Sequence, residues 1–248
     1  MYSTSLLYRQ IIAGEHWFET KVAFNSGSSY AEVLRDELIE VSAQYRMFSG
    51  DQPSVGGCLA GELSVRLLNP SFAIPRMGLV RPFVRVRNET QTSEWIPQGK
   101  FYIDTRETTN NDDGLPILSL HCYDAMLKAE ADYPNTTHNW PYLDINVVKE
   151  IAKAMGLQTY ASSTYGIDSR TITAMNNGYT IGLPAGQTMR EVLSHIAAMY
   201  GGNWVMSYDG KLLLVKLTDL PPETNLLVTP AGIPFVFEGG DEDVRIIV

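Results

Sequence analysis

A histidine, a cysteine and an aspartate stand close together at one point of the sequence, at His121, Cys122 and Asp124. A thiol paired with an imidazole could act as a nucleophile in acyl transfer. Adjacent residues on a strand point to opposite faces, however, so His121 is poorly placed to activate Cys122. We therefore predict that Cys122 is a buried core residue and that Asp124 caps a helix.

The remaining titratable residues form no recognisable catalytic or metal-binding pattern. The 4 histidines show no H-x-x-x-H spacing, and Cys58 and Cys122 form no C-x-x-C pair, so a zinc site has no local support. Paired carboxylates, as in "NNDDG" (110–114), arise by chance among 28 acidic residues. The sequence contains no nucleophile elbow and no phosphate-binding loop. We predict no catalytic, cofactor-binding or metal-binding residue and expect that the protein is not an enzyme.

Composition sets further limits on function. The chain has 248 residues, 44% of them hydrophobic and 19% charged, and a net charge of −9, which argues against ordinary nucleic-acid binding. No apolar run approaches the roughly 20 residues that span a bilayer. The first residues lack a signal-peptide pattern, so we expect cytoplasmic synthesis and no membrane insertion. Cys58 and Cys122 fit two buried thiols, although one disulfide between them stays open.

Alternating patterns predict strands in the first half of the chain. Residues 38–48 alternate loosely, and residues 61–69 place three apolar side chains on one face. Residues 79–89 alternate as well, with Pro82 suggesting an edge strand or a bulge. Their opposite face carries Arg81, Arg85 and Arg87, a stripe that could face solvent or an acidic partner.

Two more alternating runs, 101–106 and 117–122, flank the polar, glycine-ended stretch 110–114 and predict a hairpin. At least five strands before residue 124 indicate a small barrel or sandwich.

Helix signals dominate after Asp124. A short helix follows Asp124, and a second one with an apolar face and Asp144 as its cap ends at Gly156. The strongest start signal is the capping box of Thr188 and Glu191, which predicts a helix at residues 189–200. Asp209-Gly210 then predicts a hairpin with a two-residue turn.

These patterns predict an α+β fold in which a mainly β, tube- or barrel-like domain precedes a smaller α+β domain. The expected ranges are 1–123 for the β-rich domain and 124–217 for the α+β domain with its helices and hairpin. Residues 218–248 are expected to hold a linker, "TDLPPETN" (218–225), and terminal strands that return to one of the two domains or start another.

The order of these motifs resembles that of a known family, the central hub proteins of bacteriophage and prophage tail baseplates, also called tail-associated or "prophage endopeptidase tail" proteins. A strand G-x-F-x-I precedes a hairpin that ends in Tyr-Asp and leads into a short helix; the matching residues are Gly99, Phe101, Ile103, Tyr123 and Asp124. The capped helix with its Gly-Asn and Asp-Gly hairpin matches at 188–214, and the glycine turn before a long strand matches at 53–67.

The resemblance implies tube-like β domains, an adjoining α+β domain and a homotrimer that contacts the tail tube or distal tail protein and the tape-measure protein. It implies a place in the virion tail tip, where DNA passes without specific binding. A second tube domain or a lytic or fibre extension would lie beyond Val248 or be missing, and no lytic activity is carried over. The alternatives are a tail-associated cell-wall hydrolase fragment and a carbohydrate- or receptor-binding β module. The host, the tail type and the interface residues are not readable from the sequence.

Overall fold

A computed structural model describes most of the chain. The described residues are 4–26, 29–34, 37–48, 50, 52–68, 74, 78–134, 139–157, 165–175, 178–217, 236–240 and 243–247, with no side-chain description for 26, 29, 30 and 236–247. The predicted linker at 218–225 and His138 lie outside them.

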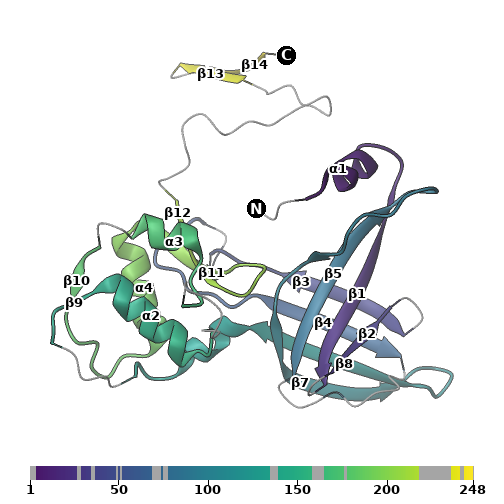
Figure 1. Ribbon diagram of the computed structural model, residues 1–248, viewed down its shortest axis with the longest axis horizontal. Helices are drawn as coiled ribbons and strands as arrows, with labels where there is room; N and C mark the ends of the chain where they lie inside the picture. The colour runs from purple at the N-terminus through teal and green to yellow at the C-terminus, as the bar shows by residue number, and fades with distance from the viewer. Residues whose placement is uncertain are drawn as a thin grey trace.

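A curved antiparallel sheet of eight strands occupies one side of the molecule (Figure 1). The strand order is β2-β1-β5-β7-β8-β4-β3, and β6 pairs with β5. The end strands β2 and β3 do not pair within the described residues, so the sheet is open there. The prediction of a mainly β, α+β fold is confirmed. Helix α1 (Leu6–Ile12) precedes the strands, which are β1 (Trp17–Ser26), β2 (Ser29–Val33), β3 (Leu38–Gln44), β4 (Glu62–Leu68), β5 (Leu79–Arg87), β6 (Ile96–Pro97), β7 (Phe101–Asn110) and β8 (Pro116–Asp124).

Strand alternation places the apolar side chains of this sheet on its inner face. Leu63, Val65 and Leu67 of β4 are all buried, as the alternating pattern predicted. They belong to an inner cluster that comprises Val22, Phe24, Val33, Leu63, Val65, Leu67, Ile74, Val80, Phe101, Ile103, Leu120 and Cys122.

The edge-strand alternative for Pro82 is wrong, because β5 lies between β1 and β7. The pairing of β5 with β1 also runs past Pro82 without a bulge. The carbonyl of Pro82 accepts a hydrogen bond from the backbone N–H of Gln98 at 2.9 Å. In an antiparallel ladder the nitrogen and the carbonyl of one residue point to the same side, so the Pro82 nitrogen also points away from β1. On that side β6 and β7 each pair with only two residues of β5. The missing N–H is tolerated because the ladder on that side is already interrupted.

The predicted hairpin at 101–124 is confirmed as β7 and β8. Its turn is closed by backbone bonds from Asn111 N–H to Leu115 O and from Gly114 N–H to Asn111 O, both 2.9 Å. Gly114 has φ +77°, a conformation that glycine adopts without steric cost. The turn lies at the end of the sheet that is remote from the helices that follow β8 (Figure 1).

Helices and short strands form a second unit after β8. The elements are the 3₁₀ helix η1 (Ala125–Glu130), β9 (Tyr142–Leu143), α2 (Asp144–Ala154), α3 (Ser169–Ala174), β10 (Thr180–Ile181), α4 (Met189–Met199), β11 (Gly202–Met206) and β12 (Leu212–Lys216). Their apolar faces form a second cluster around Trp204 and Leu193, both fully buried. Cys58 joins this cluster from the first half of the chain, and the domain ranges proposed above stay predictions.

The capping predictions for η1 and α4 are confirmed. Asp124 accepts from the Met126 N–H at 2.9 Å, and Thr188 and Glu191 form the complete capping box of α4. The predicted turn at Asp209-Gly210 is longer than two residues, however. Ser207 N–H donates to Lys211 O, and only Gly210 has positive φ, +76°. The loop is therefore the three-residue type with glycine in the left-handed position.

Asp144 does not cap α2, because the helix begins at Asp144 itself and the cap position is Leu143. Its fully buried carboxylate accepts three hydrogen bonds instead, from the backbone N–H of Ile145 (2.6 Å) and Tyr179 (3.1 Å) and from the hydroxyl of Tyr200 (2.6 Å). The carboxylate thus joins α2 to β10 and α4. A Cβ at Gly178 would lie 2.5 Å from its Oδ1, which explains the glycine.

Two further strands, β13 (Val236–Gly240) and β14 (Asp243–Ile247), pair with each other in register from Val236–Ile247 to Gly240–Asp243. Within the described residues they pair with no strand of the large sheet.

Replacing Asp144 by alanine tests this buried junction. Asp144→Ala leaves three donors without their acceptor, so we expect a loss of about 2–5 kcal/mol in the free energy of unfolding, measured by urea denaturation. Glu89→Ala, at an exposed loop position, is the control and should change stability by less than about 0.5 kcal/mol. Equal effects of the two substitutions would contradict this role for Asp144.

Candidate functional site

The residues that the sequence offered for chemistry are separated by the sheet, as predicted. His121 is half-buried, with Nε2 4.0 Å from Oε2 of Glu62, whereas Cys122 is fully buried in the inner cluster. Burial raises the pKa of the Cys122 thiol to about 12, so the thiol stays protonated near neutral pH. This pair cannot supply an activated nucleophile.

Cys58 is a second buried free thiol, so the prediction of two buried thiols is confirmed and the disulfide alternative is wrong. Its Sγ donates to Sδ of Met126 at 3.2 Å, and burial raises its pKa to about 12. Among the described residues no group of three or more His, Cys, Asp and Glu side chains could hold a metal ion. No helix in this part of the chain is long and apolar enough to cross a membrane.

Polar side chains instead gather where the large sheet meets the helical unit. We call this contact the seam and define it by Gly61, Asp124, Met126, Arg190 and Asn203. Asp124 ends β8, and its two carboxylate oxygens accept from the N–H of Gly61 (2.7 Å) and of Met126 (2.9 Å). A Cβ at Gly61 would lie 2.8 Å from Oδ2 of Asp124, so the contact requires glycine.

Burial dominates the titration of Asp124. It raises the pKa of this carboxyl to about 6, although the N–H donors of Gly61 and Met126 and the charge of Arg190 favour the ionised form. A carboxylate buried to this extent is stabilised by N–H donors that point directly at both of its oxygens.

Arg190 of α4 fastens the helical unit to the same place. Its guanidinium donates to the carbonyl oxygens of Cys58 and of Met126, the latter at 3.1 Å, and forms an ion pair with Glu130 at 2.7 Å. Because both carbonyls are backbone groups, Arg190 fixes the main chain at Cys58, before β4, and at Met126, just after Asp124.

Asn203 completes the seam from the start of β11. Its Oδ1 accepts from Gly57 N–H at 2.5 Å, and its Nδ2 donates to Ser54 O at 2.7 Å. Backbone bonds run alongside, from Gly56 N–H to Gly202 O (2.9 Å) and from Trp204 N–H to Gly57 O (2.8 Å). The glycine turn before β4 is therefore held like an extra strand against β11.

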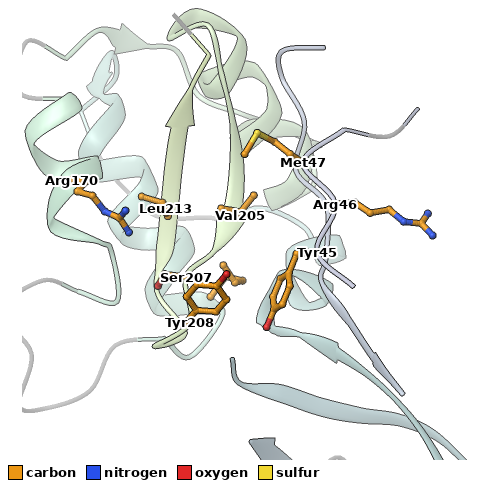
Figure 2. Close-up of a pocket in the computed structure, with 9 residues that line it drawn as sticks. Tyr45, Arg46, Met47, Arg170, Val205, Ser207, Tyr208 and Leu213 are labelled. Atoms are coloured by element: carbon orange, nitrogen blue, oxygen red, sulfur yellow. The ribbon is translucent and has the colours of Figure 1, made fainter. Parts of the chain in front are cut away.

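A pocket of about 230 Å³ opens beside the seam, between the end of β3 and the β11–β12 hairpin (Figure 2). The ring of Tyr45 lies 5.7 Å from that of Tyr208 and 5.9 Å from that of Phe101, which gives the pocket an aromatic wall. Its lining is formed by Tyr45, Arg46, Met47, Arg170, Val205, Met206, Ser207, Tyr208 and Leu213.

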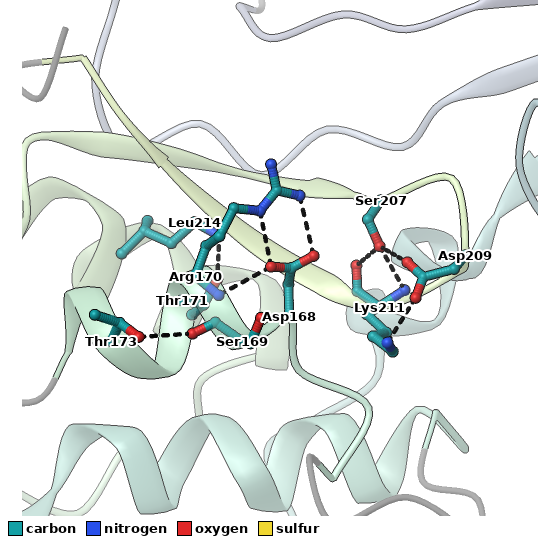
Figure 3. Close-up of polar contacts among 9 residues, drawn as sticks. All are labelled: Asp168, Ser169, Arg170, Thr171, Thr173, Ser207, Asp209, Lys211 and Leu214. Carbon is teal, nitrogen blue, oxygen red and sulfur yellow. Dashed lines mark hydrogen bonds and ion pairs between the residues drawn. The ribbon is translucent and has the colours of Figure 1, made fainter. Parts of the chain in front are cut away.

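The polar groups at this pocket are committed to structural contacts. Arg170 binds both oxygens of Asp168 at 2.9 and 3.0 Å, and Ser207 donates to Asp209 at 2.5 Å while accepting from Lys211 N–H (Figure 3). The side-chain hydrogen bond from Arg170 lowers the pKa of Asp168. This pocket suits the insertion of an apolar or aromatic side chain better than catalysis.

Cations and aromatic rings alternate on the outer face of β1 and β5. We call this surface the cationic strip and define it by Lys21, Arg81, Arg85 and Arg87 together with the rings of Trp17, Phe83 and Trp95. Lys21 Nζ lies 5.2 Å from the Phe83 ring centre and 4.9 Å from the Trp95 ring centre. On either side the guanidinium of Arg81 lies 5.4 Å from Phe83, and that of Arg85 lies 4.3 Å from Trp95.

A buried carboxylate anchors one end of the cationic strip. Glu19 has a side chain only 7% exposed and binds Arg85 at 2.7 Å and Arg87 at 2.8 Å. The fully solvated arginine face considered from the sequence is therefore wrong for these two arginines. The sequence analysis missed Glu19 because β1 was not recognised. The available signal was the two-residue spacing of Trp17, Glu19 and Lys21, which places all three on one face of the strand.

A scan against protein-family models and a search of curated proteins found no match. Among solved structures, the chain is similar to a tail protein from Neisseria meningitidis MC58, with 14% identity and a TM-score of 0.46 over 79% of this chain and 51% of that one. It is also similar to a 43 kDa tail protein of prophage MuSo2 from Shewanella oneidensis, with 12% identity and a TM-score of 0.49 over 79% and 55%. The chain thus spans about half the length of these structures, and likeness at this level does not assign a function.

The raised pKa of Asp124 predicts a pH-dependent stability. Since the folded state favours the protonated form, the contribution of Asp124 is fully present below its ordinary pKa of 3.8 and is lost as the pH rises through about 6. A shift of this size corresponds to about 3 kcal/mol. We expect the stability difference between the native protein and Asp124→Asn, measured by urea unfolding, to shrink by that order between pH 4 and pH 7.

Asp168→Asn is the matched control for this measurement. Its carboxyl has a lowered pKa, so its smaller contribution should run the opposite way and be lost as the pH falls. The Arg170 side chain is 56% exposed, which keeps that effect small. A difference between native protein and Asp124→Asn that is the same at every pH would contradict the role given to Asp124.

The raised pKa values of both thiols predict chemical inertness. We expect Cys58 and Cys122 to react with an aromatic disulfide reagent at pH 8 only after unfolding, because the folded thiols are buried and protonated. A variant with an exposed thiol, Ser42→Cys, should react at once in the folded state and release one equivalent of aromatic thiolate from the reagent. Immediate reaction of the native protein would show that one of its own thiols is accessible.

Proposed function

We propose that this chain is a structural component of a phage or phage-like tail tip, a trimeric hub that joins the tail tube to tip components. The observation that carries the proposal is the convergence on the seam of motifs that resemble those of tail hubs. These motifs are far apart in the sequence, yet they contact one another there.

Two of these contacts support the proposal directly. The Gly-Asn motif, Gly202 and Asn203, binds the upstream glycine turn at Gly56 and Gly57 through backbone and side-chain hydrogen bonds. The Tyr-Asp motif supplies Asp124, which binds Gly61. The motifs thus have one shared structural task, the joining of a β unit to an α+β unit.

The G-x-F-x-I strand reaches the same region. Phe101 is fully buried next to the Tyr45 ring, and Gly99 has φ +137° with room for no side chain, since an added Cβ would lie 2.5 Å from the Tyr45 hydroxyl. A resemblance that rests on the order of motifs gains weight when motif residues such as Gly99, Phe101 and Asp124 have contacts that explain their types.

The charge of the chain agrees with a position on the DNA path. A net charge of −9 would let DNA slide past without adhering, as a channel through a tail tip requires. The proposed partners are two further copies of the chain, the tail tube or distal tail protein and the tape-measure protein, and the proposed location is the tail tip of the virion.

The mass of the particle in solution tests this proposal. Light scattering after gel filtration should give three times the chain mass of 27.6 kDa, either for the protein alone or after addition of the distal tail or tail-tube protein. A monomer that stays monomeric with these partners, and that cleaves peptidoglycan or binds glycans, would replace the hub by one of the two alternatives named above.

A further inference from the structure

We propose that the cationic strip is one half of a head-to-tail contact, and that its occupant is the acidic β7–β8 turn of a second copy of this chain. This inference rests on the proposed trimer and names the surfaces that would join its subunits.

The cationic strip carries unmet positive charge. Within the described part of the chain its four cations form ion pairs with two carboxylates, those of Glu19 and of Glu32, which binds Lys21 at 2.8 Å, so two positive charges remain in excess. On a chain of net charge −9, such a surface suits an acidic protein partner.

The aromatic rings give the same surface the composition of an interface. Tryptophan and arginine are the residues that most often dominate binding energy at protein contacts. Here Trp17 is 39% exposed and lies against Arg87, while Arg85 is stacked on Trp95. These contacts hold the guanidinium groups in fixed positions, which lowers the entropy lost on binding.

The β7–β8 turn is a matching acidic group. Asp112 and Asp113 lie in the turn, and Asp104 and Glu107 precede it on β7. All four are exposed, and within the described residues none of them forms an ion pair. The turn is also ordered by its own bonds, because Asn111 accepts from Leu115 N–H through its side chain at 2.7 Å. The backbone that carries Asp112 and Asp113 therefore has a fixed conformation at the tip of the hairpin.

The strand register separates these two surfaces within one chain. β5 and β7 pair at Val80 and Phe101 and run antiparallel. From that pair, β5 leads to Arg81, Arg85 and Arg87, while β7 leads to the acidic turn in the opposite direction. Each copy therefore offers one cationic and one acidic surface at separate places on its sheet, an arrangement that closes into a ring when repeated around an axis.

The surplus of two charges is too small to favour a polyphosphate partner. Nucleic-acid binding depends on many cations that are free to replace counterions, whereas Arg85 and Arg87 are already paired with the buried Glu19. Binding of duplex DNA is therefore an outcome that the experiment must exclude.

Charge reversal with rescue tests the proposal. Arg81→Glu and Asp113→Lys should each raise the dissociation constant of self-association at least fivefold, measured by sedimentation equilibrium at fixed salt. The double variant, Arg81→Glu with Asp113→Lys, should return it to within about twofold of the native value, because a carboxylate and an ammonium then face each other again.

Two variants of equal charge change serve as controls. Arg66→Glu, on β4, and Asp132→Lys, after η1, alter the net charge as much as the test variants, at exposed positions outside both surfaces, and should leave the dissociation constant within about twofold of the native value. Circular dichroism and thermal melting verify folding, and Arg81→Gln provides a milder change if Arg81→Glu is misfolded.

The outcomes separate this inference from the hub proposal. An oligomer that none of the reversals weakens, or whose loss the double variant does not reverse, overturns the contact and leaves the trimer intact. A chain that is monomeric both alone and with the tail partners overturns both. If Arg81→Glu instead abolishes binding of a 30-base-pair duplex, followed by fluorescence anisotropy, the cationic strip is a nucleic-acid surface and the inference fails.

Discussion

The burial of one carboxylate is the constraint on which the arrangement of this protein depends. Asp124 lies where β8 ends and η1 begins, and both of its oxygens must find donors there, since an unsatisfied buried carboxylate would cost several kcal/mol. Those donors are Gly61 at the entry to β4 and Met126 in η1. The end of the large sheet, the start of the helices and the approach of β4 are consequently fixed at one point.

Arg190 and Asn203 extend this constraint into the helical unit. Each reaches the same short region of chain, from 54 to 61, from positions more than 130 residues away in sequence. The pocket next to the seam has its polar groups engaged in local turns, and both thiols are buried. Of the six buried polar or charged side chains in the described part of the chain, Asp124 and Asn203 are the two that hold these units together.

Sequence patterns predicted the elements whose determinants are local. The capping box of α4 needs residues only three apart, and alternation in β4 or β8 needs only one strand. Elements with apolar groups on both faces were missed. In β1 the aromatic Trp17 is followed directly by Phe18, which lies on the same face as the buried Val22 and Phe24, so no simple alternation is visible. Trp17 belongs to the cationic strip rather than to the core.

The partners of charged and polar side chains could not be predicted in the same way. Asp144 looks like a helix cap when only its neighbours in sequence are considered, but its acceptor positions are taken by Tyr179 and Tyr200. Pro82 looks like an edge residue, yet the interruption that accommodates it lies in β6 and β7. In each case the deciding group is distant along the chain, and only the folded arrangement brings it close.

The chemistry of the seam also determines which positions are free to change during evolution. Arg190 and Asn203 donate to backbone carbonyls, those of Cys58, Met126 and Ser54, so these bonds do not specify the receiving side chains. The glycines are different, because at Gly57 a Cβ would lie 2.9 Å from the Asn203 oxygen. Descendants of this sequence can therefore diverge widely while keeping a few anchors and glycines in the same order.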